Sequence, residues 1–529
     1  MHTNLTKMFF HAFILDFAER FTDLWNNRAL KAEFTMPPPN EFICTNFDII
    51  SKDIEPSTLP LQPEKILVNN VCECFYKLDA RFKLPHAFIY LYLMSPKTIS
   101  SVRNMISTSL YSMIVKHYMS EKLYPAVCAG LGYEMYSEEK GMLLKLSGYN
   151  EKLPVLLNII TNNLKSIGGL MEKSVFETYR KQLKKNCYNN LINSKFFNKD
   201  CRLFIVEEDH KFTLDRYLEA DKITFEDIVA FSNSFLDQLK VKILVQGNIE
   251  KSTSLEIGQT VLRNLNCNAI DDGARLESRA RKLPIGSHVL HIKSMLPDDK
   301  NSTITNYIQI GSSSIRLQCF IELIEKVIEE PLFDILRTQE QLGYSVGCSH
   351  RFNHGVLGIS FTVQSQEDKN PTTAVDARIE KFIHEHMLSA LEKMTDDEFA
   401  TVQTALIKLK NIVDVELESE VNRNWSEITS SEYIFNRLEL ESQMIAKLTK
   451  EKIVDFYKSR IIAPDARKLS IQVIGNGTDE NAAGDGTHVP KLQILPNHQP
   501  KVTQAVILDM NTFKDSLELY PIIKTAIEE

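Results

Sequence analysis

The chain has 529 residues, of which 43% are hydrophobic and 25% charged, a balance typical of a globular protein that can bury large cores. Its acidic and basic residues nearly offset one another and leave a formal net charge of -8, which excludes the basic surface of a nucleic-acid-binding protein and suits a basic peptide as partner. The nine cysteines are odd in number and scattered, and no stretch approaches the ~18 consecutive apolar residues of a membrane span, so we expect reduced thiols and a cytoplasmic protein.

The first predicted element is an amphipathic helix over residues 1 to about 35, because apolar residues recur at the spacing of one buried face. Polar residues interrupt the apolar run at 8–18, and no small-residue cleavage site follows it, so a packed helix is favoured over a signal peptide. Three prolines at 37–39 end the helix, and the proline-rich stretch after them is typical of a linker. Residues 1–83 are therefore predicted to be the tail of a truncated domain followed by a linker.

Regular strand and helix patterns begin near residue 84 and continue to about residue 279. Strands are indicated by short apolar or alternating runs, and helices by apolar residues every three to four positions. The predicted elements are a strand at 87–93, a helix at 100–119, a hairpin at 131–149, helices at 155–167 and 172–186, a helix with Thr224 as N-cap, and a strand at 241–248. This order is typical of a mixed α+β domain.

The same order of elements returns in residues 280–529. Its predicted members are a strand at 302–310, a helix at 316–330, a hairpin that opens at 342–344, helices at 373–387, 395–410 and 447–454, and a strand at 471–476. The stretch 477–489 is rich in Gly, Asn and Asp and predicts a flexible loop. Alternating apolar residues at 507–523 predict a last strand and a short helix.

Three pairs of landmarks in the same order indicate that the two halves are copies of one unit. The matched pairs are residues 131–133 with 342–344, 222–229 with 447–454, and 244–248 with 471–476. The sequence therefore predicts an α+β fold of two related tandem domains, at 84–279 and 280–529, each with a mostly antiparallel sheet covered by helices.

The spacing of side chains alone indicates no catalytic machinery. A zinc hydrolase would carry HExxH or HxxEH, and none of the thirteen histidines lies in such a motif; a GxSxG elbow and a Gly-rich phosphate loop are also missing. His350 and His354 flank a hairpin turn predicted at 351–353, and the histidines of His384-Glu385-His386 point in different directions on a helix. We therefore predict no metal ligand here, and we interpret acidic clusters such as 207–209 as solvated faces or helix N-terminal charges.

Arg337 and Tyr344 remain as candidate site residues. Arg337 falls at the end of a predicted helix and Tyr344 at the start of a strand, and Gly343 between them can take an unusual backbone conformation. An arginine there can satisfy helix carbonyls and a strand tyrosine is usually half core, so the residues alone favour a structural pair. The other interpretation is a guanidinium and a phenol that together face a developing oxyanion.

The segment EEPLFDILRTQEQLGYSV, with GVLGISFTVQS after it, resembles the fourth domain of the insulysin and nardilysin branch of the pitrilysin-type zinc metallopeptidases. GMLLKLSGYNEKLP is similar to the third domain, and ALKAEFTMPPPNEFICTNF to the end of the second domain and the linker. TALIKLK, EVNRNW and ILDMNTFKDSLELYPIIK look closer to the nardilysin type than to the insulysin type. The likeness covers most of the chain and identifies it as resembling the C-terminal half of such a peptidase.

This resemblance implies one half of a four-domain clamshell. In that family the first domain binds zinc through HxxEH and a distal glutamate, and the C-terminal half closes over the substrate. The resemblance also implies that Arg337 and Tyr344 are supporting catalytic residues, which contact the substrate carbonyl or the transition state. Because this chain begins inside the second domain and lacks HxxEH, we expect it to bind no zinc and to be inactive alone.

Two hypotheses for the function follow. The first is the C-terminal half of a zinc metalloendopeptidase that cleaves peptides near basic residues and needs an N-terminal half or a full-length subunit. The second is a non-catalytic peptide-binding or regulatory module that pairs with a full-length subunit, and an incomplete gene model is a third explanation of the same pattern. The expected partners are basic peptides and such a subunit, without nucleic acid or a membrane, and the resemblance is compatible with homo-oligomers.

Overall fold

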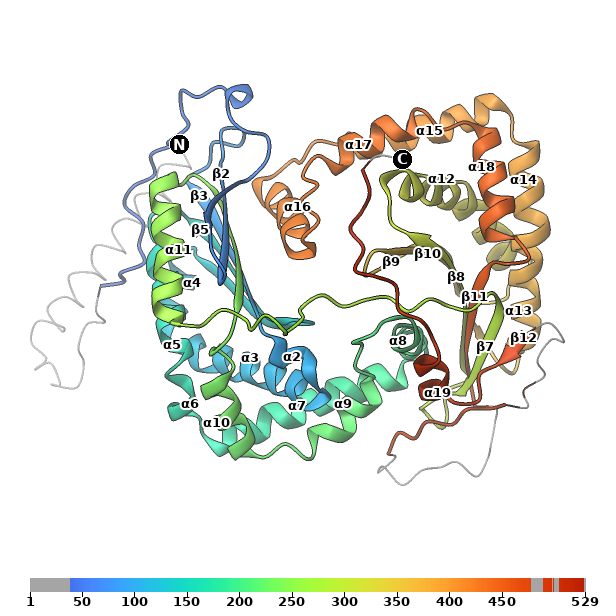
Figure 1. Ribbon diagram of the computed structural model, residues 1–529, viewed down its shortest axis with the longest axis horizontal. Coiled ribbons are helices and arrows are strands. Elements are labelled where there is room, and N and C mark those ends of the chain that lie inside the picture. The colour runs from blue at the N-terminus through green and yellow to red at the C-terminus, as the bar shows by residue number, and fades with distance from the viewer. Residues whose placement is uncertain (1–38, 477–488, 497, 499–503, 528–529) are drawn as a thin grey trace, which may run out of the picture.

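The computed structural model describes residues 39–476, 489–496, 498 and 504–527, which fold into two six-stranded sheets with helices (Figure 1). The helix predicted for residues 1–35 and most of the loop predicted for 477–489 lie outside the described residues. Every helix in the described part of the chain is too short or too polar to cross a lipid bilayer.

The first sheet is antiparallel except between β2 and β6. In sheet order its strands are β1 (Glu64–Val68), β2 (Cys72–Leu78), β6 (Lys240–Gly247), β3 (His86–Met94), β5 (Gly141–Tyr149) and β4 (Gly132–Glu138). β1 and β2 lie inside the segment that the sequence assigned to a tail and linker, so the sheet begins ahead of residue 84. The local pattern could not reveal this, because β6, the partner of β2, lies far along the chain.

Most helices of the first half share an apolar core with this sheet, some by packing on the sheet itself and others by packing on those helices. They are α2 (Pro96–Ser100), α3 (Val102–Lys122), α4 (Tyr124–Cys128), α5 (Leu153–Leu164), α6 (Ile167–Leu170), α7 (Lys173–Ile192), α9 (Thr213–Ala220), α10 (Phe225–Ser234) and α11 (Lys251–Leu265), with a 3-10 turn η1 (Pro56–Thr58) ahead of the sheet. In Figure 1, α5 and α11 lie on the outer side of the sheet.

The second sheet repeats the first over five strands. In sheet order it contains β12 (Gln504–Val506), β7 (Gly286–Lys293), β11 (Arg467–Ile474), β8 (Asn301–Ser312), β10 (Val356–Gln366) and β9 (Ser345–Asn353). β7 and β11 are parallel, as β2 and β6 are, whereas the sixth strand differs because β12 runs parallel to β7 and comes from the end of the chain. The predicted α+β fold with two related, mostly antiparallel sheets covered by helices is confirmed.

The helices of the second half follow the predicted order. They are α12 (Ile315–Leu332), α13 (Thr372–Lys381), α14 (Met387–Lys393), α15 (Asp396–Lys410), α17 (Arg437–Ile445), α18 (Lys450–Phe456) and α19 (Met510–Asp515), with π-helical turns η2 (Phe333–Gln339), η3 (Phe382–His386) and η4 (Tyr457–Ile461). The matched helices α10 and α18 both begin at a threonine cap, Thr224 and Thr449. The N-cap predicted at Thr224 is therefore confirmed.

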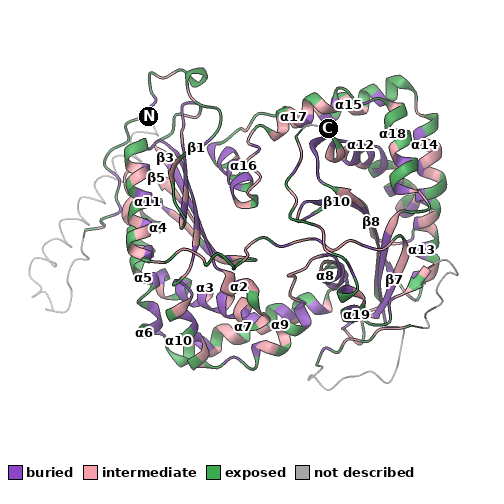
Figure 2. Ribbon diagram, in the orientation of Figure 1, coloured by how far each residue is buried: buried purple, intermediate pink, exposed green. Residues whose placement is uncertain are grey.

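Two helices cross to the opposite sheet and join the halves. α16 (Leu417–Ser430) covers the inner face of the first sheet with Val421, Trp425 and Ile428, which are buried together with aromatic residues of β2 and β3 (Figure 2). α8 (Ser194–Val206) packs on the second sheet, where the Asn198 amide donates to the Thr303 carbonyl at 2.9 Å. Each half therefore completes the core of the other.

Candidate functional site

Arg337 lies on η2, the π-helical continuation of α12 that leads into the loop before β9. Pro331 lacks an N–H inside α12, and the wider turn begins two residues later. The N–H of Glu340 donates to the Ile335 carbonyl at 3.0 Å, and Arg378 holds the Glu340 carboxylate with two donors. These bonds fix the end of the helix on which Arg337 lies.

The loop between η2 and β9 has a tightly determined backbone. Gln341 takes a left-handed conformation with a φ of 51°, and the Asn370 amide donates to the Leu342 carbonyl at 3.1 Å. A Cβ added at Gly343 would lie 1.8 Å from the carbonyl oxygen of Gln364 on β10. Only glycine fits at this close approach, and it brings the next residue, the site tyrosine, to the sheet edge.

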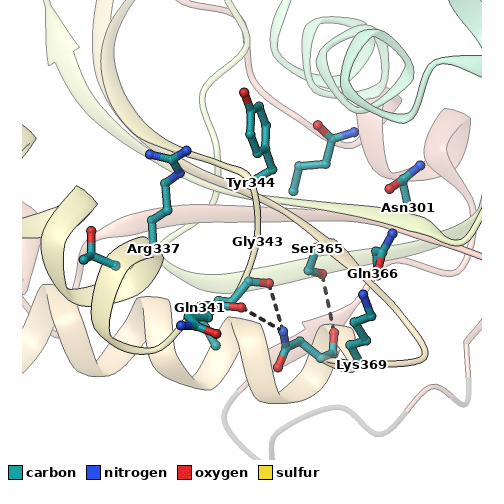
Figure 3. A pocket seen from close by; sticks show the side chains of 12 residues that line it. Asn301, Arg337, Gln341, Gly343, Tyr344, Ser365, Gln366 and Lys369 are labelled. Atoms are coloured by element: carbon teal, nitrogen blue, oxygen red, sulfur yellow. Dashed lines mark hydrogen bonds between the residues drawn. The ribbon is translucent and has the colours of Figure 1, made fainter.

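Arg337 and Tyr344 point to the same side of this loop (Figure 3). The Arg337 guanidinium carbon lies 5.2 Å from the centre of the Tyr344 ring and 4.5 Å from that of Phe333, so the cation stacks on two aromatic rings. Tyr344 is 86% exposed, which rules out the half-core interpretation for it. A hollow of about 740 Å³ lies beside the pair; its lining includes Asn301, Gln364, Gln366, Lys369 and Asn370.

The histidines of the β9–β10 hairpin do not form a metal site. The turn is made by His354 and Gly355, with φ of 45° and 83°, and not by residues 351–353 as predicted, because the left-handed pair closes the hairpin in two residues. His350 Nδ1 bonds Glu325 Oε2 at 2.7 Å, whereas His354 Nε2 lies 3.8 Å from Glu207 Oε2. The two rings thus face different carboxylates and do not converge on one ion.

The wider donor set does not fit zinc either. In the second candidate pair, His384 and His386, His384 has half of its side chain exposed, and its Nε2 lies 3.7 Å from Glu380 Oε2. Within the described residues, no group of three or more His, Cys, Asp or Glu side chains is placed to hold a metal ion. The residues that the structure describes therefore do not fit the metal that the family resemblance implies.

Glu207 is not on a solvated face, and the interpretation of that acidic cluster as solvated is wrong for this residue. The Asn353 amide donates to Glu207 at 2.5 Å, and His210 Nδ1 and His354 Nε2 lie 3.6 and 3.8 Å from its carboxylate. Burial would raise the pKa of Glu207, but His354, His210 and Asn353 hold it below its ordinary value. Of the partners of Glu207, only His210 is near it in the sequence. The others come from the second half of the chain and could not be predicted from the local pattern.

Two family models match the chain. The first, described as the middle or third domain of peptidase M16, matches residues 13–220, and the second, the C-terminal lobe domain 4 of PQQ synthase PqqF-like proteins, matches residues 323–425. Human nardilysin is 33% identical over 523 residues, which cover 96% of this chain and 45% of nardilysin. The chain is thus similar to the middle or third domain of peptidase M16 over residues 13–220 and to nardilysin over nearly all of its length.

Two further comparisons give a similar coverage of the chain. Human insulin-degrading enzyme is 29% identical over 517 residues, covering 95% of this chain and 49% of that enzyme. The crystal structure of pitrilysin superimposes with a TM-score of 0.77 at 18% identity, over 92% of this chain and 49% of pitrilysin, and so supports the fold. The chain spans about half the length of the relatives it matches.

Proposed function

We propose that this chain is the C-terminal half of a zinc metalloendopeptidase of the nardilysin and insulysin type, which cleaves peptides near basic residues. In this proposal an N-terminal half, or a full-length subunit, supplies the zinc site, and this chain closes the chamber and helps to bind the substrate. The observation that carries the proposal is the pair of half-buried Arg337 and exposed Tyr344, which stack on one side of the loop before β9. The match to about half of each relative supports it.

The chemistry of the pair suits a peptide carbonyl. The guanidinium of Arg337 is permanently charged and carries five N–H donors, and the phenol of Tyr344 carries one O–H donor. A carbonyl oxygen between them would accept from both, and these bonds strengthen as negative charge develops on that oxygen in the transition state. Neither group needs to transfer a proton, so the pair supports catalysis without supplying the nucleophile.

The proposal places the protein in the cytoplasm. All nine cysteines are free thiols, and six of them are buried. Burial raises the pKa of the Cys72 thiol, in the middle of the first sheet, to about 12, so it stays protonated and unreactive at neutral pH. Free thiols of this kind suit a reducing environment.

A reconstitution assay tests the proposal. The purified chain is mixed with a separately expressed N-terminal half of nardilysin, and cleavage of a quenched fluorescent peptide with a dibasic site is followed. We expect cleavage only when both halves are present. Arg337→Ala and Tyr344→Phe should each lower kcat/KM by roughly 100- to 1,000-fold, the cost of removing one donor to a developing oxyanion.

Matched controls are available on exposed surfaces away from the pair. Arg460→Ala on η4 and Tyr124→Phe on α4 remove the same groups and should leave kcat/KM unchanged. If the variants at the pair behave like these controls, its supporting role is wrong. If both halves associate and bind the peptide without cleaving it, the chain acts instead as a non-catalytic peptide-binding module.

A further inference from the structure

β9 is the outer strand at one end of the second sheet, and no described strand pairs with its free edge. The two-residue turn makes Asn353 and Val356 the closing pair of the hairpin, so alternate residues of β9 turn their N–H and C=O groups away from β10. These residues include Val346, Cys348 and His350. The His350 N–H confirms the direction, because it donates to the Glu325 carboxylate on α12 at 3.2 Å.

A hollow of about 590 Å³ lies between this edge and the end of α12, a volume within the ~300–1,000 Å³ of ligand sites. Residues of β9 form one wall, and residues of α12 and η2 form the other. The lining residues are Lys326, Glu329, Glu330, Phe333, Asp334, Thr338, Val346, Gly347 and Cys348. This hollow is distinct from the one beside Tyr344, and Thr338 is the lining residue that the two have in common.

This hollow forms a groove along β9, and the groove carries an excess of negative charge. Glu329, Glu330 and Asp334 are exposed, and the lining cation, Lys326, already pairs with Glu329 at 3.1 Å. Burial, followed by the charges of Glu325 and Glu329, raises the pKa of the Cys348 thiol to about 12, so the field of these carboxylates reaches the strand. Phe333 is 43% exposed and offers an apolar surface beside the carboxylates.

We propose that this groove binds a basic peptide in extended conformation, which adds as a strand to the free edge of β9. The outward N–H and C=O groups of Val346 and Cys348 would pair with the peptide backbone. Lysine or arginine side chains on one face of the peptide would lie against Glu329, Glu330 and Asp334, with their alkyl stems on Phe333.

The negative charge of the groove favours a basic peptide over a second copy of this chain as its occupant. A second copy of this chain would bring an identical acidic groove and a net charge of -8, which disfavours edge-to-edge pairing of two β9 strands. Binding here goes beyond the proposed peptidase role, since it requires neither an N-terminal half nor the Arg337–Tyr344 pair. The site would hold a basic segment on the C-terminal half itself.

The test uses the full chain alone and a short fluorescent peptide that alternates lysine and valine, with fluorescence anisotropy as the readout. We expect saturable binding. The same peptide with alternate backbone amides N-methylated should bind at least about tenfold more weakly, because it cannot pair with a strand edge. Equal affinity for both peptides would overturn strand addition, since it would leave charge attraction alone as the cause.

The protein variants locate the site. Glu329→Gln, Glu330→Gln and Asp334→Asn combined should raise the Kd about tenfold, as expected for the loss of three exposed charge contacts, and thermal unfolding checks that the fold is kept. The control is Glu121→Gln with Glu256→Gln, two exposed glutamates on α3 and α11, which should leave the Kd unchanged. Equal effects of both sets would overturn the assignment of the peptide to this groove.

Discussion

Gly343 determines where the site tyrosine lies. Its φ is not left-handed, so the backbone conformation does not require glycine at this position. Glycine is required because the Gln364 carbonyl of β10 occupies the place where a Cβ would lie. Leu342, on one side, is buried in the core, and Tyr344, on the other, is exposed. The chain therefore changes from core to surface within three residues, and glycine allows it to pass against β10 as it does so.

Gly343→Ala should destabilise the protein by about 1–3 kcal/mol, because the added methyl group must displace the backbone of β10. Gly347→Ala is the matched control, because a Cβ there meets no atom within 4 Å. Chemical denaturation of both variants measures the difference. If Gly343→Ala is as stable as Gly347→Ala, the close approach to Gln364 does not constrain the loop.

At the scale of elements, α16 shows what determines which sheet a helix covers. α16 is amphipathic like its neighbouring helices, yet its apolar face packs on the sheet of the other half. Trp425 lies edge-on to Tyr90 of β3, with ring centres 5.7 Å apart, and Lys242 of β6 donates to the Ile428 carbonyl at 2.5 Å. These partners are far apart in sequence and join the halves.

Trp425→Ala should lower the free energy of unfolding by about 3–5 kcal/mol, because it leaves a large cavity under α16. It should also split the calorimetric transition in two, since the halves lose part of their shared core. Ile412→Ala, at an exposed residue between α15 and α16, should change stability by less than about 0.5 kcal/mol. A single, equally shifted transition for both variants would contradict the coupling role of α16.

The sequence predicted most elements because helix and strand periodicities are local. The threonine cap at Thr224 and the repeat of two sheets were both visible in this way. Pairings between distant segments were not: β1 and β2 joined a sheet whose other strands come later, and Glu207 met His354 of the other half. Arg337 and Tyr344 were identifiable as candidates, but their stacking and exposure depend on the close approach at Gly343.

At the scale of the whole molecule, the two hairpin tips meet beside α8. Glu139 lies in the β4–β5 turn of the first sheet, and His354 in the β9–β10 turn of the second, with 3.9 Å between Glu139 Oε1 and His354 Nε2. Glu207, at the end of α8, also faces His354, with 3.8 Å between Glu207 Oε2 and His354 Nε2, and it faces His210, which bonds Asp200 at 2.8 Å. A titratable cluster thus lies at the junction of the halves.

Burial would lower the pKa of His354, but the carboxylates of Glu207 and Glu139 outweigh it, and Lys140 opposes them weakly, so the pKa lies above its ordinary value of 6.5. The folded state therefore binds this proton more tightly than the unfolded state does. The stability that results is complete below about pH 6.5 and is lost as the pH rises through the folded-state pKa. The pKa of Glu207 is shifted in the opposite direction, below its ordinary value of 4.5. Its contribution to stability is therefore complete above about pH 4.5 and is lost as the pH falls through the folded-state pKa.

His354→Gln should therefore be less stable than the wild type near pH 6. The difference should shrink as the pH rises through the folded-state pKa of His354, above which the imidazole is neutral in both the folded and the unfolded protein. The measurement is the free energy of unfolding from denaturant titrations across this range. His384→Gln, at a half-exposed histidine of η3, is the control for the loss of an imidazole away from the junction of the halves. A deficit of His354→Gln that does not change with pH would mean that its packing, and not its charge, joins the two hairpin tips.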